Sequence, residues 1–423
     1  MNVLVLGSGG REHALAYQIS KSNLLDKLYV APGNAGTSAI AENITLSVTD
    51  FDGLSNFVAS HNIDMLIVGP EDPLVLGIVD FFRSKPEFKN LHIIGPDKLG
   101  AKLEGSKDFA KEFMQKYNIP TASYFCAKTT NTEEAESYLA KLKPPYVLKA
   151  DGLAAGKGVL ILENYEEAKS ELQEMLSGKF GSAENKVVIE EYLKGIECSV
   201  FVLTDGESYV VLPEAKDYKR IGENNTGLNT GGMGALSPVP FYDKDFACKT
   251  EERIIKPTIE GIKQEKMDYR GFIFFGLMNV DGNPYVIEYN VRMGDPETEA
   301  VLPRIKTDLL SLFVAASEKK LDKIKLNISD EAAATVIVVS GGYPGHYEKN
   351  KIITGIDEVT ESIVFHSGTA SNNEHTLTAG GRVLAISSFG KDIFEAIEKS
   401  YRSVKKIQFD NMYFRKDLGT DLK

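Results

Sequence analysis

Three polar side chains near the end of an apolar segment offer the most specific chemistry in the sequence. Glu288, Asn290 and Arg292 stand at alternate positions in the stretch VIEYNVRMGDPE. In an extended strand they are predicted to share one face, with Ile287 and Val291 on the other. A carboxylate and an amide oxygen suit Mg²⁺, which shares its shell with phosphate and water, and a guanidinium beside them suits a transferring phosphoryl group. In isolation, a solvated strand end with a surface Glu and Arg is the alternative.

Size, charge and cysteine content limit the class of protein. A chain of 423 residues predicts roughly two to four domains, and 43% hydrophobic with 26% charged residues is the composition of a soluble globular protein. A net charge of −12 argues against a nucleic-acid partner, which would require a basic face. The three cysteines lack metal or disulfide spacing, so we expect a reduced, cytoplasmic compartment. The N-terminal apolar stretch is too short for a signal peptide, and no run reaches the length of a membrane span.

The first hundred residues alternate short apolar strands with helical segments. Strands are predicted at 2–6, 28–30, 65–68 and 91–94, each followed by a loop rich in Gly or Pro. This order indicates βαβ units on a parallel sheet, whose ligands collect beyond the carboxyl ends of the strands. We therefore expect one rim of the sheet to carry the loop residues Gly9, Gly10, Asn34, Gly69 and Glu71.

The first of these loops resembles a dinucleotide fingerprint but departs from it. Glu12 stands where the third glycine would be, and Ala31 and Pro32 replace the acidic ribose partner at the end of the second strand. Backbone N–H groups of the Gly9–Gly10 loop at a helix start are instead predicted to hold a small phosphate ester. A tight turn that needs glycine only for packing is the alternative.

A second glycine-rich loop follows the apolar strand 146–148. The segment 151–158 resembles a P-loop, but its glycine spacing is one residue short, Gly158 replaces the Ser or Thr, and a strand follows instead of a helix. We predict a mobile flap between two antiparallel strands that closes over a triphosphate, with Lys149 and Lys157 supplying its positive charge.

Further along the chain, three segments bear on ligand binding or domain limits. A single helix is predicted from Asp97 to Tyr117, followed by the first domain boundary. The segment 190–193 offers apolar faces and backbone groups to an adenine ring, and Glu197 could accept hydrogen bonds from ribose. A strand joined to a hairpin, with no role in binding, would have the same sequence pattern and is the alternative. The glycine-rich segment 224–234, preceded by basic residues, favours a loop that orders on an anionic ligand.

The last hundred residues read as a separate region of short strands and turns. Strands are predicted at 333–339, 362–366 and 382–387, with a helix at 392–404. His346, His366 and His375 have no spacing typical of metal ligands, so surface or turn positions are the better interpretation.

Taken together, the motifs resemble one enzyme family. GSGGREHAL at Gly7, APGNAGT at Ala31, GPEDPLVLGIVD at Gly69, LEGSKDFAKEFM at Leu103, VLKADGLAAGKGV at Val147, DYKRIGENNTGLNTGGMGALSP at Asp217 and EYNVRMGDPETE at Glu288 occur in this order. The set resembles the phosphoribosylamine–glycine ligase (glycinamide ribonucleotide synthetase) family of the ATP-grasp superfamily. The resemblance covers essentially the whole chain.

The resemblance implies a multidomain α/β and α+β fold. It consists of a parallel-sheet N-terminal domain (1–105), an ATP-grasp domain (106–325) with an inserted lid at about 121–192, and a C-terminal domain of mixed strands and helices (326–423). It also implies ligation of glycine to 5-phosphoribosylamine with ATP as co-substrate and Mg²⁺ or Mn²⁺ as cofactor, through a glycyl phosphate. Small molecules would be the only partners, with no nucleic acid or membrane, and a monomer is expected.

Carried over by position, the resemblance assigns the site residues. Nucleotide contacts fall on Lys107, Lys149, Gly156, Lys157, Gly158, Glu190, Glu191, Tyr192, Leu193 and Glu197. Metal ligands fall on Glu288 and Asn290, and catalytic roles on Arg292, Lys149 and Asp295. Substrate contacts fall on Gly9, Gly10, Asn34, Gly69, Glu71, Asp217, Lys219, Asn229 and Gly294.

Three other functions compete with this interpretation. Another ATP-grasp carboxylate–amine ligase of purine synthesis would share the activation chemistry and differ in the N-terminal loops and the segment 217–238. A nicotinamide-dependent oxidoreductase could use the first domain, although Glu12 weighs against it. An ATP-binding scaffold without turnover would not need the full set of basic and metal-ligand residues.

Overall fold

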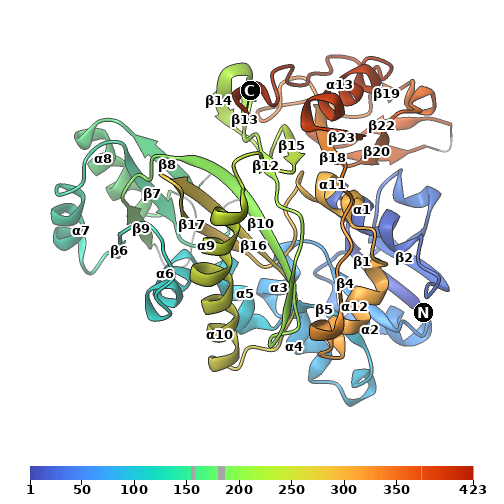
Figure 1. The fold of residues 1–423 in the computed structure, drawn as a ribbon, viewed down its shortest axis with the longest axis horizontal. Helices are drawn as coiled ribbons and strands as arrows, with labels where there is room; N and C mark the ends of the chain where they lie inside the picture. The colour runs from blue at the N-terminus through green and yellow to red at the C-terminus, as the bar shows by residue number, and fades with distance from the viewer. Residues whose placement is uncertain (154–157, 180–185, 373, 423) are drawn as a thin grey trace.

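The fold is known from a computed structural model that describes residues 1–153, 158–179, 186–372 and 374–422. The predicted flap residues Gly156 and Lys157 lie outside these ranges. The N-terminal part is a parallel sheet of β1 (Asn2–Gly7), β2 (Lys27–Pro32), β3 (Glu42–Asn43), β4 (Met65–Val68) and β5 (His92–Pro96). Helices α1 (Gly10–Ile19), α2 (Phe51–Ser60), α3 (Glu71–Leu76) and α4 (Ile78–Arg83) alternate with the strands, as predicted (Figure 1).

This sheet continues without a break into the central part of the molecule. Its order is β11-β10-β16-β5-β4-β1-β2-β3, with β17 paired to β16. The added strands are antiparallel: β10 (Ile196–Thr204), β11 (Tyr209–Val211), β16 (Tyr269–Val280) and β17 (Asn283–Asn290). The joint is short, with Tyr269 opposite Pro96 and Arg270 opposite Gly95. Apolar cores on the two faces combine residues of both parts, so the N-terminal loops and β17 are held in fixed relation.

The segment after Asp97 is not the single helix that its pattern predicts. It forms α5 (Lys98–Gly105) and α6 (Lys107–Lys116), which are separated at Ser106. Ser106 has extended backbone angles, and its Oγ accepts from the N–H of Phe109 at 3.2 Å, so it caps the second helix. The prediction failed because a serine cap inside an otherwise helical stretch was not weighed.

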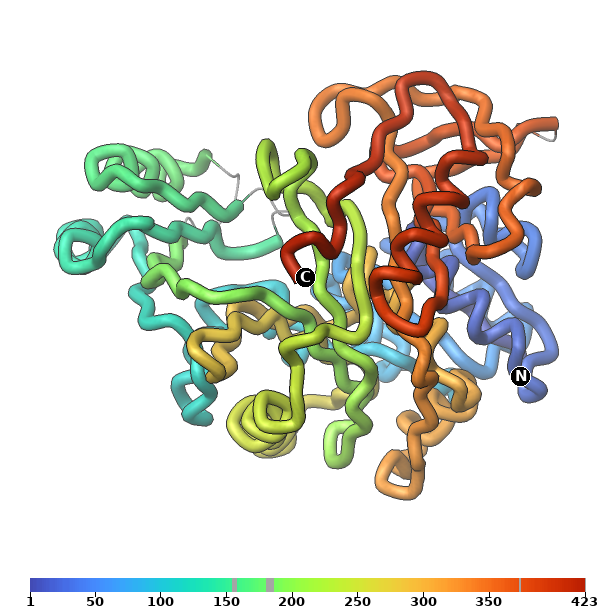
Figure 2. The backbone as a smooth tube through the Cα atoms, turned by 45° about the horizontal axis from the view of Figure 1, so that its top comes forward, coloured from blue at the N-terminus to red at the C-terminus, as the bar shows by residue number. Residues whose placement is uncertain are grey.

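The lid is a separate antiparallel sheet in the order β6-β9-β7-β8. Its strands are β6 (Tyr124–Ala127), β7 (Tyr146–Ala150), β8 (Val159–Leu162) and β9 (Val187–Glu190), and its helices are α7 (Thr132–Leu139) and α8 (Tyr165–Leu176). It has its own apolar core, which includes Leu148, Leu172 and Ile189. Figures 1 and 2 show it projecting to the left, away from the N-terminal strands.

The C-terminal sheet includes two strands from the middle of the chain. Its order is β12-β15-β18-β23-β20, where β12 (Lys216–Asp217) and β15 (Gly234–Ser237) precede β18 (Ala332–Val339), β20 (Ile363–His366) and β23 (Arg382–Gly390). Helix α13 (Ile393–Val404) covers one face, and β19 (Ile352–Ile353), β21 (Thr369–Ser371) and β22 (Thr376–Thr378) form a small sheet beside it. The predicted strands and helix of this region are confirmed.

The remaining helices and strands connect these parts. They are the strands β13 (Arg220–Gly222) and β14 (Thr226–Asn229) and the helices α9 (Lys244–Thr250), α10 (Lys256–Gln264), α11 (Thr298–Val301) and α12 (Leu309–Ser317). A π-helical turn at Glu251–Ile255 joins α9 to α10. Among the described residues, no helix is long and apolar enough to cross a membrane.

Candidate active site

The end of β17 presents Glu288 and Asn290 beside the joint with β16. Asn290 lies opposite Phe274 and Glu288 opposite Gly276, and a bulge follows, because Leu277 pairs with Val286. Ile287 is the extra residue, and it is only partly buried while Val286 is fully buried. The predicted alternation therefore holds from Glu288 onward and is wrong for Ile287, since a bulge adds one residue to the two-residue period.

The two predicted metal ligands are free to bind a cation. Within the described residues, neither the Glu288 carboxylate nor the Asn290 side chain forms a hydrogen bond or an ion pair. A Cβ on Gly276 would lie 3.0 Å from Glu288 Cγ, so β16 offers no second carboxylate at this point. Among the described residues no group of three or more His, Cys, Asp or Glu could hold a metal. One carboxylate and one amide fit Mg²⁺ or Mn²⁺ that takes most of its ligands from phosphate and water.

Arg292 joins β17 to two elements of the N-terminal part. Its Nη2 lies 2.8 Å from Glu104 Oε1 on α5, and its Nε donates to Glu71 Oε2 at 3.2 Å. Glu104 also accepts from the N–H of Val291 at 2.8 Å. Burial raises the pKa of Glu104 to about 7, against the opposing effect of Arg292. The guanidinium is thus oriented from both sides at the end of the candidate metal strand.

On the lid, two predicted nucleotide contacts meet each other. Lys149 of β7 lies 2.9 Å from Glu190 of β9, and Lys149 Nζ also donates to the carbonyl of Ile287 at 3.2 Å. The ammonium group of a lid strand is therefore next to the residue that precedes Glu288. This contact brings the lid and the end of β17 into one site.

Other predicted nucleotide residues surround this contact. Lys107 begins α6, and its Nζ donates to the carbonyl of Gly152 at 2.9 Å, while Asp151 accepts from the Lys107 N–H at 2.6 Å. Burial lowers the pKa of Lys107, and Glu288 acts in the opposite direction. The carbonyl of Gly158 accepts from Ala150 N at 2.7 Å.

The segment that follows β9 is exposed and includes the aromatic side chain of Tyr192. Glu191 accepts from Ser123 N at 2.8 Å, Leu193 is partly buried, and Tyr192 is 43% exposed. An exposed tyrosine beside a partly buried leucine is consistent with an adenine contact.

Two residues predicted to bind different ligands are paired with each other. Glu197 Oε2 lies 2.6 Å from Lys219 Nζ, and this cation lowers the pKa of Glu197. Asp217 is beside them on β12, and burial raises its pKa while Lys219 opposes the rise. The predicted ribose acceptor and the predicted substrate lysine thus belong to one charged group on the face of β10 and β12.

The first glycine loop is filled by Glu12. Its carboxylate accepts from Gly9 N at 2.7 Å and lies 2.5 Å from Arg11 Nε. A Cβ on Gly7 or Gly69 would come within 2.4 Å of Glu12 side-chain atoms. Gly7 and Gly69 must therefore be glycine to leave room for the Glu12 side chain. Glu12, which replaces the third glycine of the dinucleotide fingerprint, fills the space beside this loop.

Asp295 reaches the same loop from the other side. Its Oδ2 would lie 3.3 Å from a Cβ on Gly9, and its Oδ1 lies 3.1 Å from Arg382 Nη1. Arg382 comes from β23, and it also donates to the carbonyls of Asp295 at 2.8 Å and Gly231 at 2.6 Å. Near Gly10, the buried carboxylate of Glu299 has no hydrogen-bond partner in the described structure.

Three other predicted substrate residues differ in their surroundings. The Asn34 side chain donates to the carbonyls of Ser8 (2.9 Å) and His366 (2.7 Å) and accepts from two backbone N–H groups, so it holds loops together. Gly294 leaves room for Glu297, because a Cβ there would lie 2.4 Å from its carboxylate. Asn229 ends β14 and is exposed.

The segment 224–234 is more ordered than an open loop. Its first part pairs with β13 as a hairpin, and Arg415 of the C-terminal domain donates to Asn225 Oδ1 at 2.9 Å and to the carbonyl of Arg220 at 3.2 Å. Asp417 accepts from Asn224 N at 2.7 Å. A protein contact thus provides order that sequence reasoning assigned to an anionic ligand.

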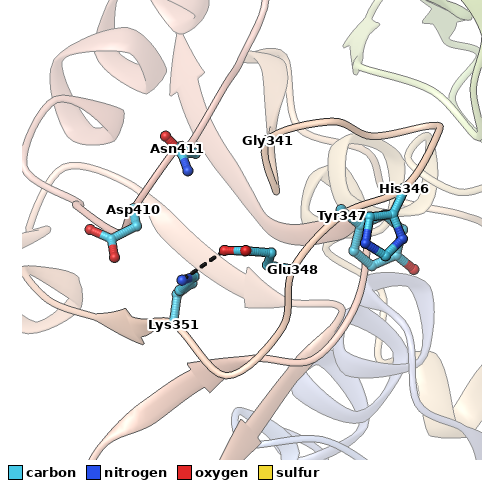
Figure 3. Close-up of a pocket in the computed structure, with 7 residues that line it drawn as sticks. All are labelled: Gly341, His346, Tyr347, Glu348, Lys351, Asp410 and Asn411. Atoms are coloured by element: carbon cyan, nitrogen blue, oxygen red, sulfur yellow. Dashed lines mark ion pairs between the residues drawn. The ribbon is translucent and has the colours of Figure 1, made fainter.

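A cavity elsewhere in the molecule does not belong to this site. A cavity of about 210 Å³ lies in the C-terminal domain, where Glu348 and Lys351 form an ion pair at 2.8 Å. Figure 3 shows the residues that line it. None of the predicted site residues is among its lining residues, which are Gly341, His346, Tyr347, Glu348, Lys351, Asp410 and Asn411.

Sequence reasoning missed the residues that orient the site from a distance. Glu104, Arg382, Glu299 and the lysine partner of Glu190, Lys111, were not singled out. Glu104 and Lys111 lie in helical stretches where a charged residue is ordinary. Glu299 lies in the motif that begins at Glu288, as Glu104 and Lys111 lie in the motif that begins at Leu103, and nothing in the sequence indicates that these side chains are buried or which partners they have.

The fold and the site define an ATP-grasp enzyme. Domain models named phosphoribosylglycinamide synthetase match the chain in order: the N domain at residues 1–104, the ATP-grasp (A) domain at 105–298 and the C domain at 333–421. The chain belongs to the phosphoribosylglycinamide synthetase family, whose members are ATP-dependent ligases of purine biosynthesis.

Relatives support this over the whole length. A phosphoribosylamine–glycine ligase of Fusobacterium nucleatum is 46% identical over 427 residues, covering 99% of this chain and 98% of the relative. The ligase of Escherichia coli K12 is 45% identical with the same coverage. The crystal structure of a phosphoribosylamine–glycine ligase from Thermotoga maritima is 35% identical, with a TM-score of 0.86, and covers 99% of this chain and 100% of that chain. The family and fold predictions are therefore confirmed.

Proposed function

We propose that this site joins glycine to 5-phosphoribosylamine with ATP, giving glycinamide ribonucleotide, ADP and phosphate. The observation that carries the proposal is the position of Arg292. It follows the strand of Glu288 and Asn290 and contacts Glu71, the first residue of α3 in the N-terminal part, at 3.2 Å. The guanidinium of Arg292 therefore connects the strand assigned to the metal and phosphates with the N-terminal residues assigned to the sugar.

The nucleotide is assigned to the space between the lid and β17. Lys149 contacts a carbonyl of β17, and it is assigned with Lys107 and the flap around Gly158 to the phosphates. The segment from Glu190 to Leu193 is assigned to adenine, and Glu197 to ribose.

Glu288 and Asn290 would hold the metal. Mg²⁺ or Mn²⁺ bound there would offset the charge of the phosphate oxygens during transfer. ATP-grasp ligases as a class use ATP with such a metal. The unpaired oxygens of these two residues are the structural support for the assignment.

The other substrates are assigned to the opposite rim. Phosphoribosylamine is placed at the loops of Gly9, Gly10, Asn34, Gly69 and Glu71, and glycine near Asp217, Lys219, Asn229, Gly294 and Asp295. The side chain of Asn34 already forms hydrogen bonds within the protein, so Asn34 would contribute to substrate binding indirectly, by fixing the backbone of the Ser8 loop.

Two bond exchanges complete the reaction. A glycine carboxylate oxygen attacks the γ-phosphorus, the bond to the ADP oxygen breaks, and Arg292 and Lys149 stabilise charge on the equatorial oxygens. The amine of phosphoribosylamine then attacks the glycyl phosphate carbon, the carbon–oxygen bond to phosphate breaks, and the amine loses a proton. Asp295 is the carboxylate assigned to accept it.

The same proposal includes the organisation of the chain. We divide it into 1–105, 106–325 with a lid at about 121–192, and 326–423, and the family domains support this order. We also propose a monomer that acts in the cytoplasm, which size-exclusion chromatography and cell fractionation would test.

The test is phosphate release from Mg-ATP by the purified protein. Release should require glycine and phosphoribosylamine together and should be at background with either one alone. Release that ignores one of the two substrates would contradict the proposal.

A further inference from the structure

A single buried carboxylate on the lid is held by two lysines. Glu190 Oε2 lies 2.9 Å from Lys149 Nζ, and Glu190 Oε1 lies 3.2 Å from Lys111 Nζ. The exposed fractions are 4% for Glu190, 6% for Lys149 and 2% for Lys111. Lys149 has a proposed role with ATP, and Lys111 has none.

Lys111 is fixed from α6 at the point where the chain enters the lid. Its Nζ donates to Thr121 Oγ1 at 2.8 Å and to the carbonyl of Ala122 at 3.3 Å. Thr121 is itself attached to the central sheet, because its Oγ1 donates to the carbonyl of Val286 at 2.7 Å. Lys111 therefore cannot move toward a ligand without breaking three contacts.

Lys149 has fewer ties. Apart from Glu190, its Nζ donates to the carbonyl of Ile287, which lies directly before Glu288 in β17. A nucleotide phosphate near Glu288 would be close to this ammonium group. Lys149 is thus the member of the trio that is able to exchange its partner.

The trio carries a net positive charge, because two ammonium groups face one buried carboxylate. Glu191 near Lys111 and Glu197 near Lys149 offset part of this charge, and a nucleotide phosphate beside Lys149 would offset more. Burial lowers the pKa of Lys111 to about 8, although Glu190 opposes the shift, so the group is still mostly charged at pH 7. If Lys149 were the sole partner of Glu190, moving it to a phosphate would leave the carboxylate buried and unpaired.

We propose that Lys111 is a positioning residue for ATP: it is the permanent counterion of Glu190, and this frees Lys149 to pair with the nucleotide phosphates. The inference rests on the proposed function, because it uses the placement of ATP beside Lys149. It is the charge of Lys111, beyond its hydrogen bonds at the lid entrance, that the role requires.

Three substitutions separate charge from tethering. Lys111→Gln keeps a donor for Thr121 and removes the charge, Lys111→Met removes both, and Lys111→Arg keeps the charge. The matched control is Lys116→Met on the same helix, whose side chain is 62% exposed and pairs with Glu265. The dissociation constant of Mg-ATP is measured by calorimetry, and KM for ATP and for glycine by phosphate release.

Both neutral variants should weaken Mg-ATP binding by at least about tenfold, while KM for glycine changes less than about twofold. Lys111→Arg should recover most of the affinity, and the control should match the wild type. Wild-type affinity in Lys111→Gln, or an equal change in both KM values, would overturn the proposal. If one neutral variant does not fold by circular dichroism, the other decides.

Calorimetry keeps this test apart from the proposed function. A wild-type protein that binds ATP but releases no phosphate with both substrates would contradict the proposed function alone. Unchanged ATP affinity in a folded neutral variant of an active enzyme would contradict the role of Lys111 alone.

Discussion

Replacing Arg292 by methionine should damage catalysis far more than stability. The proposed function assigns the guanidinium to the transferring phosphoryl group, and removing a contact of that kind lowers kcat by about 10²- to 10³-fold. In the folded protein it lies 2.8 Å from Glu104, whose side chain is 6% exposed. Breaking a buried ion pair usually costs about 3–5 kcal/mol, so a large loss of stability would be the ordinary expectation.

The pKa of Glu104 changes this expectation. Because that pKa is about 7, the carboxyl is already half protonated at pH 7. Without Arg292, the ionised fraction of Glu104 should take up a proton, which costs only about 0.4 kcal/mol at pH 7 and about 1.4 kcal/mol at pH 8. The cost rises with pH because the ionised form that Arg292 stabilises is populated above the folded pKa. Lost hydrogen bonds add about 1 kcal/mol at either pH. The penalty should therefore grow as pH rises from 7 to 8.

The assay combines turnover with denaturation at both pH values. Phosphate release gives kcat, and urea unfolding gives the free energy of unfolding, with Arg402→Met as the control because Arg402 pairs with Glu361 at the surface. A loss above about 3 kcal/mol that does not depend on pH, with kcat reduced less than about threefold, would make Arg292 a structural tie and refute the reasoning.

Three shorter predictions address other parts of the molecule. Glu288→Gln should lower turnover at least about 100-fold while the melting temperature stays near that of the wild type, because its carboxylate has no partner in the described structure; retained activity would exclude it as a metal ligand. Arg382→Met should raise KM for phosphoribosylamine at least about tenfold and KM for ATP much less, because Arg382 holds Asp295 against the Gly9 loop that is assigned to phosphoribosylamine; equal changes in the two would count against a local role. Burial lowers the pKa of His13 to about 3 and that of His366 to about 4, so as the pH falls through 6.5 the unfolded chain takes up protons that the native protein does not; stability should fall by about 1.6 kcal/mol per histidine between pH 6.5 and 5. Urea unfolding of His13→Asn should show a shallower fall than the wild type and than the exposed control His375→Asn, and identical slopes would contradict this.

The local pattern of the sequence was sufficient for most elements. Short β-branched runs followed by Gly or Pro predicted the parallel strands, and the apolar runs at 333–339 and 382–387 predicted β18 and β23. The failures are also local in origin. Ser106 divides a helix through its side-chain cap, and the bulge at Ile287 shifts a face by one residue, and neither alters the hydrophobic pattern that predicts an element.

The site was predictable where a motif carries its own chemistry and was missed where partners come from distant segments. Arg292 was found, but Glu104 lies 188 positions earlier in the chain and Arg382 lies 90 positions later. Such pairs are set by the sheet that joins the N-terminal and central parts, which no local signal announces. The hydrogen bonds from Arg415 to the 220–229 hairpin could not be predicted for the same reason, because the two segments are far apart in the sequence.

The central claim is that a glycine carboxylate oxygen becomes bonded to the γ-phosphorus before the amide forms. Glycine labelled with ¹⁸O in both carboxylate oxygens tests it by mass spectrometry of the products. One labelled oxygen should appear in the released phosphate and the other in the amide, because the bridging oxygen leaves with phosphorus. Unlabelled phosphate released in step with the amide would contradict the claim.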